Sequence, residues 1–134
     1  MASRLSSAPH PVDQVPPIGK LTVLGIQHVL AFYAGAVVVP LVIASGLGLD
    51  NHTLVHLINA DLLTCGIATI IQSAGIGRFI GVKLPLIQGV TFTAVSPLIA
   101  IGAAATPPGA DPTTGLATMY GSIIAVGLIV FLVA

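Results

Sequence analysis

Three side chains that could handle a proton, a cation or a polar solute lie inside long apolar runs of this sequence. Gln27 and His28 are adjacent in the first run, and Asp61 lies well inside the second. An uncompensated charge at membrane depth is costly, so Asp61 is expected to be protonated, or to meet a hydrogen-bond donor or a bound cation. These residues are candidates for orienting a solute or coupling its movement to an ion. For each, a structural hydrogen bond to neighbouring helices is the alternative.

The third apolar run, residues 84–101, contains residues that oppose a continuous helix. Pro85 lacks an N–H donor, Gly89 lowers helix stability, and residues 90–95 are rich in strand-favouring types. Irregular backbone at membrane depth is tolerated only where protein buries it or where it lines a cavity. We therefore predict a short extended segment over residues 90–95, placed to meet a solute.

This extended segment is predicted to lead into a half-helix that begins at Pro97, with Ser96 as its N-cap. Free backbone groups and the positive end of the half-helix would then face the same point. Such groups suit a planar heterocycle with alternating donors and acceptors, and Phe92 could stack on its face. The alternative is a kinked helix lined by satisfied Thr and Ser side chains.

Composition places the chain in a membrane. It has 134 residues, of which 55% are hydrophobic and 6% are charged, and its mean hydropathy is +1.07. A soluble domain has roughly a quarter of its residues charged. Nucleic-acid binding is excluded because there is no basic cluster. An enzyme is not expected because no nucleophile is paired with a base, and the single cysteine offers no metal or disulfide framework.

Four apolar blocks follow a polar, Pro-rich tail at residues 1–19. The blocks cover about residues 21–47, 54–76, 84–101 and 116–134. At 1.5 Å per residue, about 20 residues cross a hydrocarbon core of roughly 30 Å. The expected fold class is therefore an all-α polytopic membrane protein, with a flexible cytoplasmic tail and a transmembrane domain at residues 20–134. The last block is still apolar at its end, which favours a fragment of a longer polypeptide.

The basic residues all fall on one side of the predicted spans. They are Arg4, Lys20, Arg78 and Lys83. The remaining loops, which hold Asp50 and Asp111, contain no Lys or Arg. The positive-inside rule then predicts a cytoplasmic N-terminus in a multi-pass protein of the plasma membrane.

Three sequence blocks, in this order, resemble the nucleobase/ascorbate transporter family, the nucleobase:cation symporters of the xanthine/uracil permease type. The resemblance runs from about Pro17 to the end of the chain. It is carried by LGIQH at 24–28 with AGAVVVPL at 34–41, by NADL at 59–62 with CGIAT at 65–69, and by LP at 84–85 with GVTFTAVSP at 89–97. These residues look more like the xanthine and uric acid branch than the uracil branch.

The resemblance implies a transporter of 14 spans, built as two inverted repeats of seven with a core domain and a gate domain. This chain would supply four spans of the core, with a short strand breaking the third. Carried over by position, Phe92 and Gly35 are candidate substrate-binding residues, and Thr91 and Gly89 of the predicted break join them as candidates. Gln27, His28 and Asp61 are the candidates for orienting the site or coupling the ion.

The expected function is import of xanthine or uric acid with a cation, H⁺ or Na⁺, by alternating access, and no other cofactor is implied. The expected partners are the nucleobase, the lipid bilayer and the missing C-terminal spans, and a homodimer stays open. Alternatives are a transporter of uracil, ascorbate or an inorganic anion with the same fold, or a non-transporting membrane subunit. Four spans alone are not expected to transport.

Overall fold

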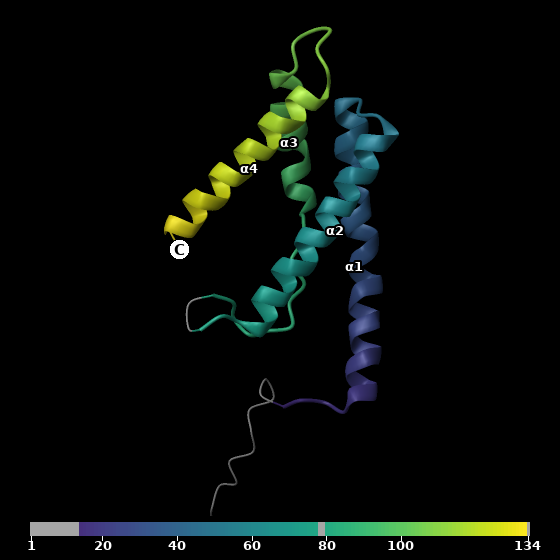
Figure 1. The fold of residues 1–134 in the computed structure, drawn as a ribbon, viewed down its shortest axis with the longest axis vertical. Helices are drawn as coiled ribbons and strands as arrows, with labels where there is room; N and C mark the ends of the chain where they lie inside the picture. The colour runs from purple at the N-terminus through teal and green to yellow at the C-terminus, as the bar shows by residue number, and fades with distance from the viewer. Residues whose placement is uncertain (1–13, 78–79, 134) are drawn as a thin grey trace, which may run out of the picture.

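The computed structural model describes residues 14–77 and 80–133, and four helices make up most of that part of the chain. They are α1 (Ile18–Leu47), α2 (Asn51–Ala74), α3 (Phe92–Ala105) and α4 (Thr113–Val133). In Figure 1, α2 runs back beside α1, α3 lies centrally, and α4 descends along the other side of α3. Of the tail predicted at residues 1–19, residues 1–13, with Arg4, lie outside the described residues, as does Arg78, and α1 already begins at Ile18. The all-α prediction is confirmed for the rest.

Three of these helices, α1, α2 and α4, are long and apolar enough to cross a membrane, judged by length and composition. The fourth, α3, has 14 residues. At 1.5 Å per residue this is about 21 Å, which is shorter than a hydrocarbon core. The third block therefore does not contain one continuous spanning helix.

The predicted interruption of the third block is confirmed, but it lies earlier than expected. Residues 84–91 are not helical, and Thr91 precedes α3 in an extended conformation with φ −113° and ψ 146°. Helix α3 then begins at Phe92. The predicted strand over residues 90–95 is therefore wrong for residues 92–95, and the described part of the chain contains an isolated β-bridge but no strand.

The predicted half-helix start at Pro97 is also wrong, because Ser96 and Pro97 both lie inside α3. The physical reason is a buried face at helical spacing. Val95 and Gly102 are buried, and Leu98 and Ile99 are half-buried between them. Burial of this i, i+3, i+4, i+7 face outweighs the weak strand preference of single residues.

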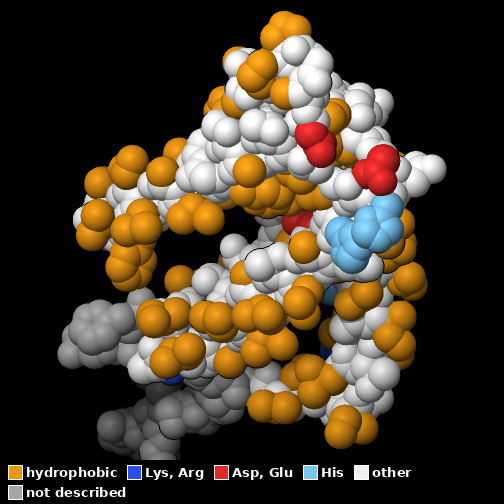
Figure 2. All heavy atoms as spheres, turned by 45° about the horizontal axis from the view of Figure 1, so that its top comes forward, with side chains coloured by type: hydrophobic (Ala, Val, Ile, Leu, Met, Phe, Trp, Pro, Cys, Tyr) orange, Lys and Arg blue, Asp and Glu red, His pale blue; other side chains and the backbone are white. Residues whose placement is uncertain are grey.

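A small apolar core holds α1, α3 and α4 together. Its buried members are Val39 and Ile43 from α1, Val95 from α3 and Met119 from α4. Most other large apolar side chains are exposed, and Figure 2 shows them covering much of the surface. Such a surface is expected where lipid, rather than water, is the solvent.

The turn between α1 and α2 is short and well capped. Gly48 ends α1 in the left-handed region with φ 68°, and Asp50 begins α2 by accepting a 3.2 Å hydrogen bond from the Thr53 N–H. Hydrogen bonds from Thr53 hold the pKa of the Asp50 carboxyl below its usual value. These caps make α1 and α2 antiparallel neighbours.

Helices α3 and α4 meet at two glycines. A Cβ on Gly115 would overlap the Gly102 carbonyl oxygen and the Thr106 hydroxyl. A Cβ on Gly102 would lie 2.8 Å from a methyl group of Leu47. The two backbones therefore touch directly, which is how small residues let membrane helices approach closely.

The connection from α2 to α3 folds back along α2. Ile76 and Ile80 form an isolated antiparallel bridge, and the Lys83 N–H donates to the Gln72 carbonyl at 3.2 Å. Gly81 has φ 79°, and a Cβ there would lie 2.5 Å from the Ile71 carbonyl oxygen, so only glycine fits. This turn directs residues 84–91 back towards the middle of the bundle (Figure 1).

Candidate substrate site

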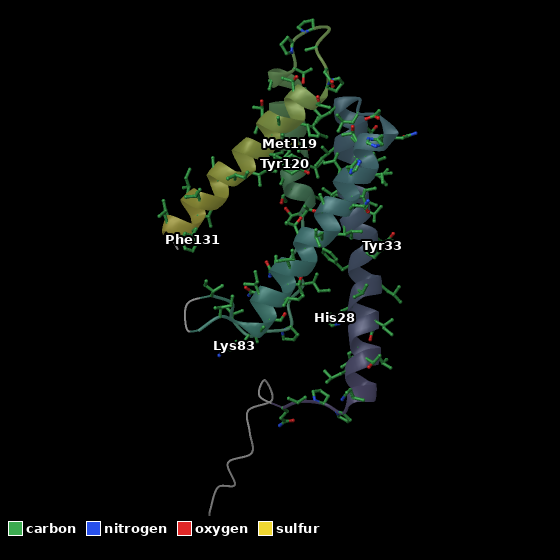
Figure 3. The ribbon with its side chains drawn as sticks, viewed as in Figure 1. His28, Tyr33, Lys83, Met119, Tyr120 and Phe131 are labelled. Carbon is green, nitrogen blue, oxygen red and sulfur yellow. The ribbon has the colours of Figure 1, made fainter. Side chains whose placement is uncertain are left out.

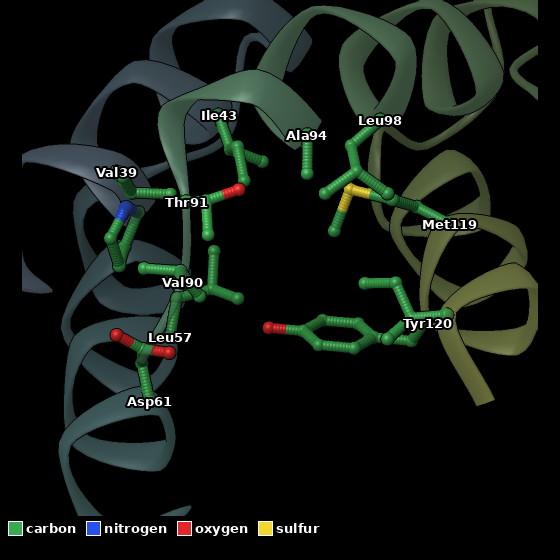
Figure 4. Close-up of a pocket in the computed structure, with 12 residues that line it drawn as sticks. Val39, Ile43, Leu57, Asp61, Val90, Thr91, Ala94, Leu98, Met119 and Tyr120 are labelled. Carbon is green, nitrogen blue, oxygen red and sulfur yellow. The ribbon is translucent and has the colours of Figure 1, made fainter. Parts of the chain in front are cut away.

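A cavity of about 180 Å³ lies where all four helices and the extended segment meet. Most of its wall is apolar, with Val39 and Ile43 from α1 and Leu98 from α3 among the lining residues. Three side chains bring polar atoms to it: Asp61 from α2, Thr91 from the extended segment and Tyr120 from α4 (Figure 4). A mostly apolar cavity with a few polar groups is typical of a small-molecule site.

The carboxylate of Asp61 is incompletely hydrogen-bonded. Its Oδ1 accepts from the Cys65 Sγ at 3.7 Å, one turn further along α2. Its Oδ2 is buried and has no hydrogen-bond partner among the residues that the structure describes. A buried oxygen without a partner is unfavourable unless a proton, an ion or a ligand satisfies it.

The hydroxyl end of Tyr120 points across the cavity towards the side on which Asp61 and Val90 lie (Figure 4). Met119, the residue before Tyr120, is fully buried in the core and fixes this part of α4. A phenol can both donate and accept a hydrogen bond. The carboxylate and the phenol therefore present hydrogen-bonding groups to one small space.

The N-terminus of α3 adds donors to the same space. Thr91 and Ala94 line the cavity, and within the described residues Thr91 makes no side-chain capping bond to α3. The Thr91 hydroxyl instead lies 2.6 Å from the Thr93 hydroxyl. The first N–H groups of a helix have no intrahelical carbonyl partner, and they carry a partial positive charge. They suit a carbonyl oxygen of a bound solute.

The extended segment is held against both neighbouring helices. The Gln88 N–H donates to the Thr69 hydroxyl of α2 at 2.9 Å. On the other side, a Cβ on Gly89 would overlap the ring of Phe32 in α1. Because Gly89 has no Cβ, the segment can pack directly on α1. The Thr69 hydroxyl accepts a hydrogen bond from one of the backbone N–H groups that would otherwise lack a helical partner.

Replacing Thr69 with valine is expected to loosen this segment. The change keeps the shape of the side chain but leaves the part-buried Gln88 N–H without its acceptor, at a cost of about 1–3 kcal/mol. Hydrogen exchange at Gln88 and its neighbours should then become faster. Thr64→Val is the matched control, because the Thr64 hydroxyl donates to the Ala60 carbonyl of its own helix rather than holding the extended segment. Equal exchange in both variants would contradict this role for Thr69.

Two of the residues predicted from the sequence, Asp61 and Thr91, line the cavity. Phe92 begins α3 beside it, but its side chain is 60% exposed and is not among the lining residues. Gly35 is half-buried one turn before Val39, and Gly89 packs on Phe32. Substrate contacts by these three residues stay predictions.

Gln27 and His28 lie in the N-terminal half of α1, whereas the residues of α1 that line the cavity lie in its C-terminal half. Figure 3 shows His28 on the lower half of α1, far from Met119 and Tyr120. Both side chains are exposed, and the His28 Nδ1 donates to the Leu24 carbonyl at 3.1 Å, within its own turn. Their proposed role in orienting the site also stays a prediction.

The sequence interpretation missed the contribution of α4. Met119, Tyr120 and Ile123 all line the cavity. The available signal was Tyr120 itself, an aromatic residue with a polar tip in an otherwise apolar block. Its position across the cavity from Asp61 depends on how α4 crosses α3, which local sequence does not reveal.

Long apolar helices with a largely apolar outer surface are typical of an integral membrane protein. Residues 19–134 match the model of a family described as the permease family. The chain is 50% identical, over 92% of its length, to the uric acid transporter UacT of Escherichia coli (strain K12). It is 48% identical over 87% of its length to the xanthine permease of Bacillus subtilis (strain 168), and 46% identical over 86% to the uric acid permease PucK of the same organism.

The chain therefore belongs to this permease family, the nucleobase/ascorbate transporters that its sequence blocks resemble. It spans 24% of the length of each of these three relatives. No solved structure gives a significant match. Membership in a family of transporters agrees with the prediction that the chain is not an enzyme.

Proposed function

We propose that this chain contributes the first spans of a transporter that imports a purine nucleobase, xanthine or uric acid, across the plasma membrane. The relatives named as uric acid and xanthine permeases support this substrate class. The observation that carries the proposal is Asp61 Oδ2, which has no hydrogen-bond partner among the described residues and lies beside a cavity that also receives the N-terminus of α3. A purine with ring N–H donors and carbonyl acceptors matches both groups.

The size of the cavity is consistent with a small solute. At about 180 Å³ it is smaller than the roughly 300 Å³ at which sites for drug-sized ligands begin. In the proposed complex, Asp61 accepts from a ring N–H and the first turn of α3 donates to a carbonyl oxygen. Phe92 and the backbone of residues 84–91 complete the contacts from the third span.

The proposed architecture is that of the whole family: 14 spans in two inverted repeats, with the remaining spans closing the site and moving against it. The large exposed apolar area of α4 supports a location among further helices or lipid. A second copy of the transporter in a homodimer is part of the same proposal. Alternating access then exposes the cavity to each side in turn.

The proposed orientation places the N-terminus in the cytoplasm. Lys20 lies at the start of α1 and Lys83 lies against the end of α2, and these antiparallel helices bring both lysines to one end of the bundle. Asp50 and Asp111 line a common depression at the opposite end. This separation of charges supports the positive-inside orientation.

Uptake of labelled purines tests the proposal directly. The complete reading frame that encodes this chain, expressed in cells that lack their own purine permeases, should accumulate xanthine or uric acid above the level of uracil. A proton ionophore should abolish the accumulation if H⁺ is the coupling ion. Absence of purine uptake from a protein that reaches the membrane would contradict the proposed function.

A further inference from the structure

Two histidines of α2 converge on the surface of the protein, away from the cavity. The Nε2 atoms of His52 and His56 lie 3.3 Å apart, and the two rings meet edge to face with centroids 4.5 Å apart. Both side chains are exposed. Figure 2 shows imidazoles (pale blue) grouped on the surface near carboxylates (red).

We propose that His52 and His56 form a binding site for a divalent transition-metal ion, with Zn²⁺ as the ion of choice. The spacing of four residues places both rings on one face of the helix, as in helical zinc sites. Exposed rings could each turn into water, yet here both present the same nitrogen to one point. The site lies outside the proposed purine cavity, and it does not depend on the proposed function.

The distance between the two nitrogens fits a shared metal ion. Zn–N bonds of 2.0–2.1 Å at a tetrahedral angle place two ligand nitrogens about 3.3–3.4 Å apart. The separation in this protein is 3.3 Å. The two imidazoles could instead share one N–H···N hydrogen bond, and titration with Zn²⁺ distinguishes this hydrogen bond from a metal site.

The surroundings of the pair favour a cation. Asp50 lies two residues before His52, and its carboxylate is held in place as the N-cap of α2. Both imidazoles are open to solvent, so an ion can enter and water can fill its remaining coordination positions. An ion held by His52 and His56 would fix the first two turns of α2, the helix that carries Leu57 and Asp61 into the cavity.

The test is titration of the full chain, purified in detergent without a polyhistidine tag, with zinc chloride. Isothermal calorimetry should give one ion per chain, and thermal unfolding should move to higher temperature, because an ion that binds only the folded helix stabilises it. His52→Gln or His56→Gln should each weaken binding on the order of a hundredfold, since one ligand replaces a chelating pair. Both positions are exposed, and circular dichroism verifies that the variants keep their helices.

His10→Gln and His28→Gln are the matched controls, because they remove the other two imidazoles of the chain. They should leave Zn²⁺ affinity unchanged. The inference is overturned if the chain binds no Zn²⁺, if His52→Gln and His56→Gln bind it as tightly as the original chain, or if the control variants lose as much affinity. These measurements do not involve purine uptake, so they test the metal site independently of the proposed transport function.

Discussion

Replacing Gly115 with alanine is expected to separate α3 from α4 and to destabilise the fold by about 1–3 kcal/mol, the range for overpacking a tight contact. The added Cβ would overlap the backbone of Gly102 and the hydroxyl of Thr106. That hydroxyl is itself held by a 2.9 Å hydrogen bond to the Gly102 carbonyl, so it cannot simply turn away. Because α4 carries Met119 and Tyr120, the cavity should open as well. Thermal unfolding in detergent measures the loss.

Gly121→Ala is the matched control for this prediction. Gly121 lies on the same helix, and a Cβ there would meet no atom within 4 Å. Alanine is a better helix former than glycine by up to about 1 kcal/mol, so this variant should be as stable as the original or slightly more so. Equal melting temperatures for Gly115→Ala and the original chain would contradict the direct contact between α3 and α4.

Replacing Asp61 with asparagine is expected to reduce purine uptake by the complete transporter by roughly 10- to 100-fold. The change keeps the size of the side chain but replaces the charged carboxylate that would accept a hydrogen bond from a ring N–H with a neutral amide. A hydrogen bond to a charged group contributes about 1.5–3 kcal/mol. The residue lies beside the cavity, with one oxygen that lacks a partner among the described residues. Initial rates of labelled uric acid uptake, normalised to the amount of protein in the membrane, measure the effect.

Asp111→Asn provides the comparison. Asp111 lies at the start of α4, where it accepts a 2.9 Å hydrogen bond from the Thr113 N–H, and it does not line the cavity. Asparagine caps a helix about as well as aspartate, so uptake should be unaffected. Similar losses in both variants would mean that a general change in charge, rather than the site, explains the result.

The break in the third apolar block was predictable from sequence because Pro85 and Gly89 both act locally. Each residue disfavours a helix by itself, whatever surrounds it. The start of α3 was not predictable in the same way. It depends on the burial of Val95 and Gly102 against other helices, which is a tertiary effect that single-residue preferences do not contain.

The candidate site was likewise predictable from the sequence only in part. A carboxylate inside an apolar run is conspicuous in a sequence, so Asp61 was found, and Thr91 was found because it lies in the predicted break. Tyr120 was missed, because its place opposite Asp61 depends on the crossing of α3 and α4 at Gly102 and Gly115. The sequence patterns of α3 and α4 do not show which residues of one helix lie against which residues of the other.

A structure of the complete transporter with bound uric acid would show directly whether the base occupies the proposed cavity. We expect the base to lie between Asp61, the first turn of α3 and Tyr120, with the Asp61 carboxylate within hydrogen-bond distance of a ring N–H. Residues 84–91 should remain non-helical around the base. A base bound elsewhere, with Asp61 paired to a protein side chain and one unbroken helix through the third span, would contradict it.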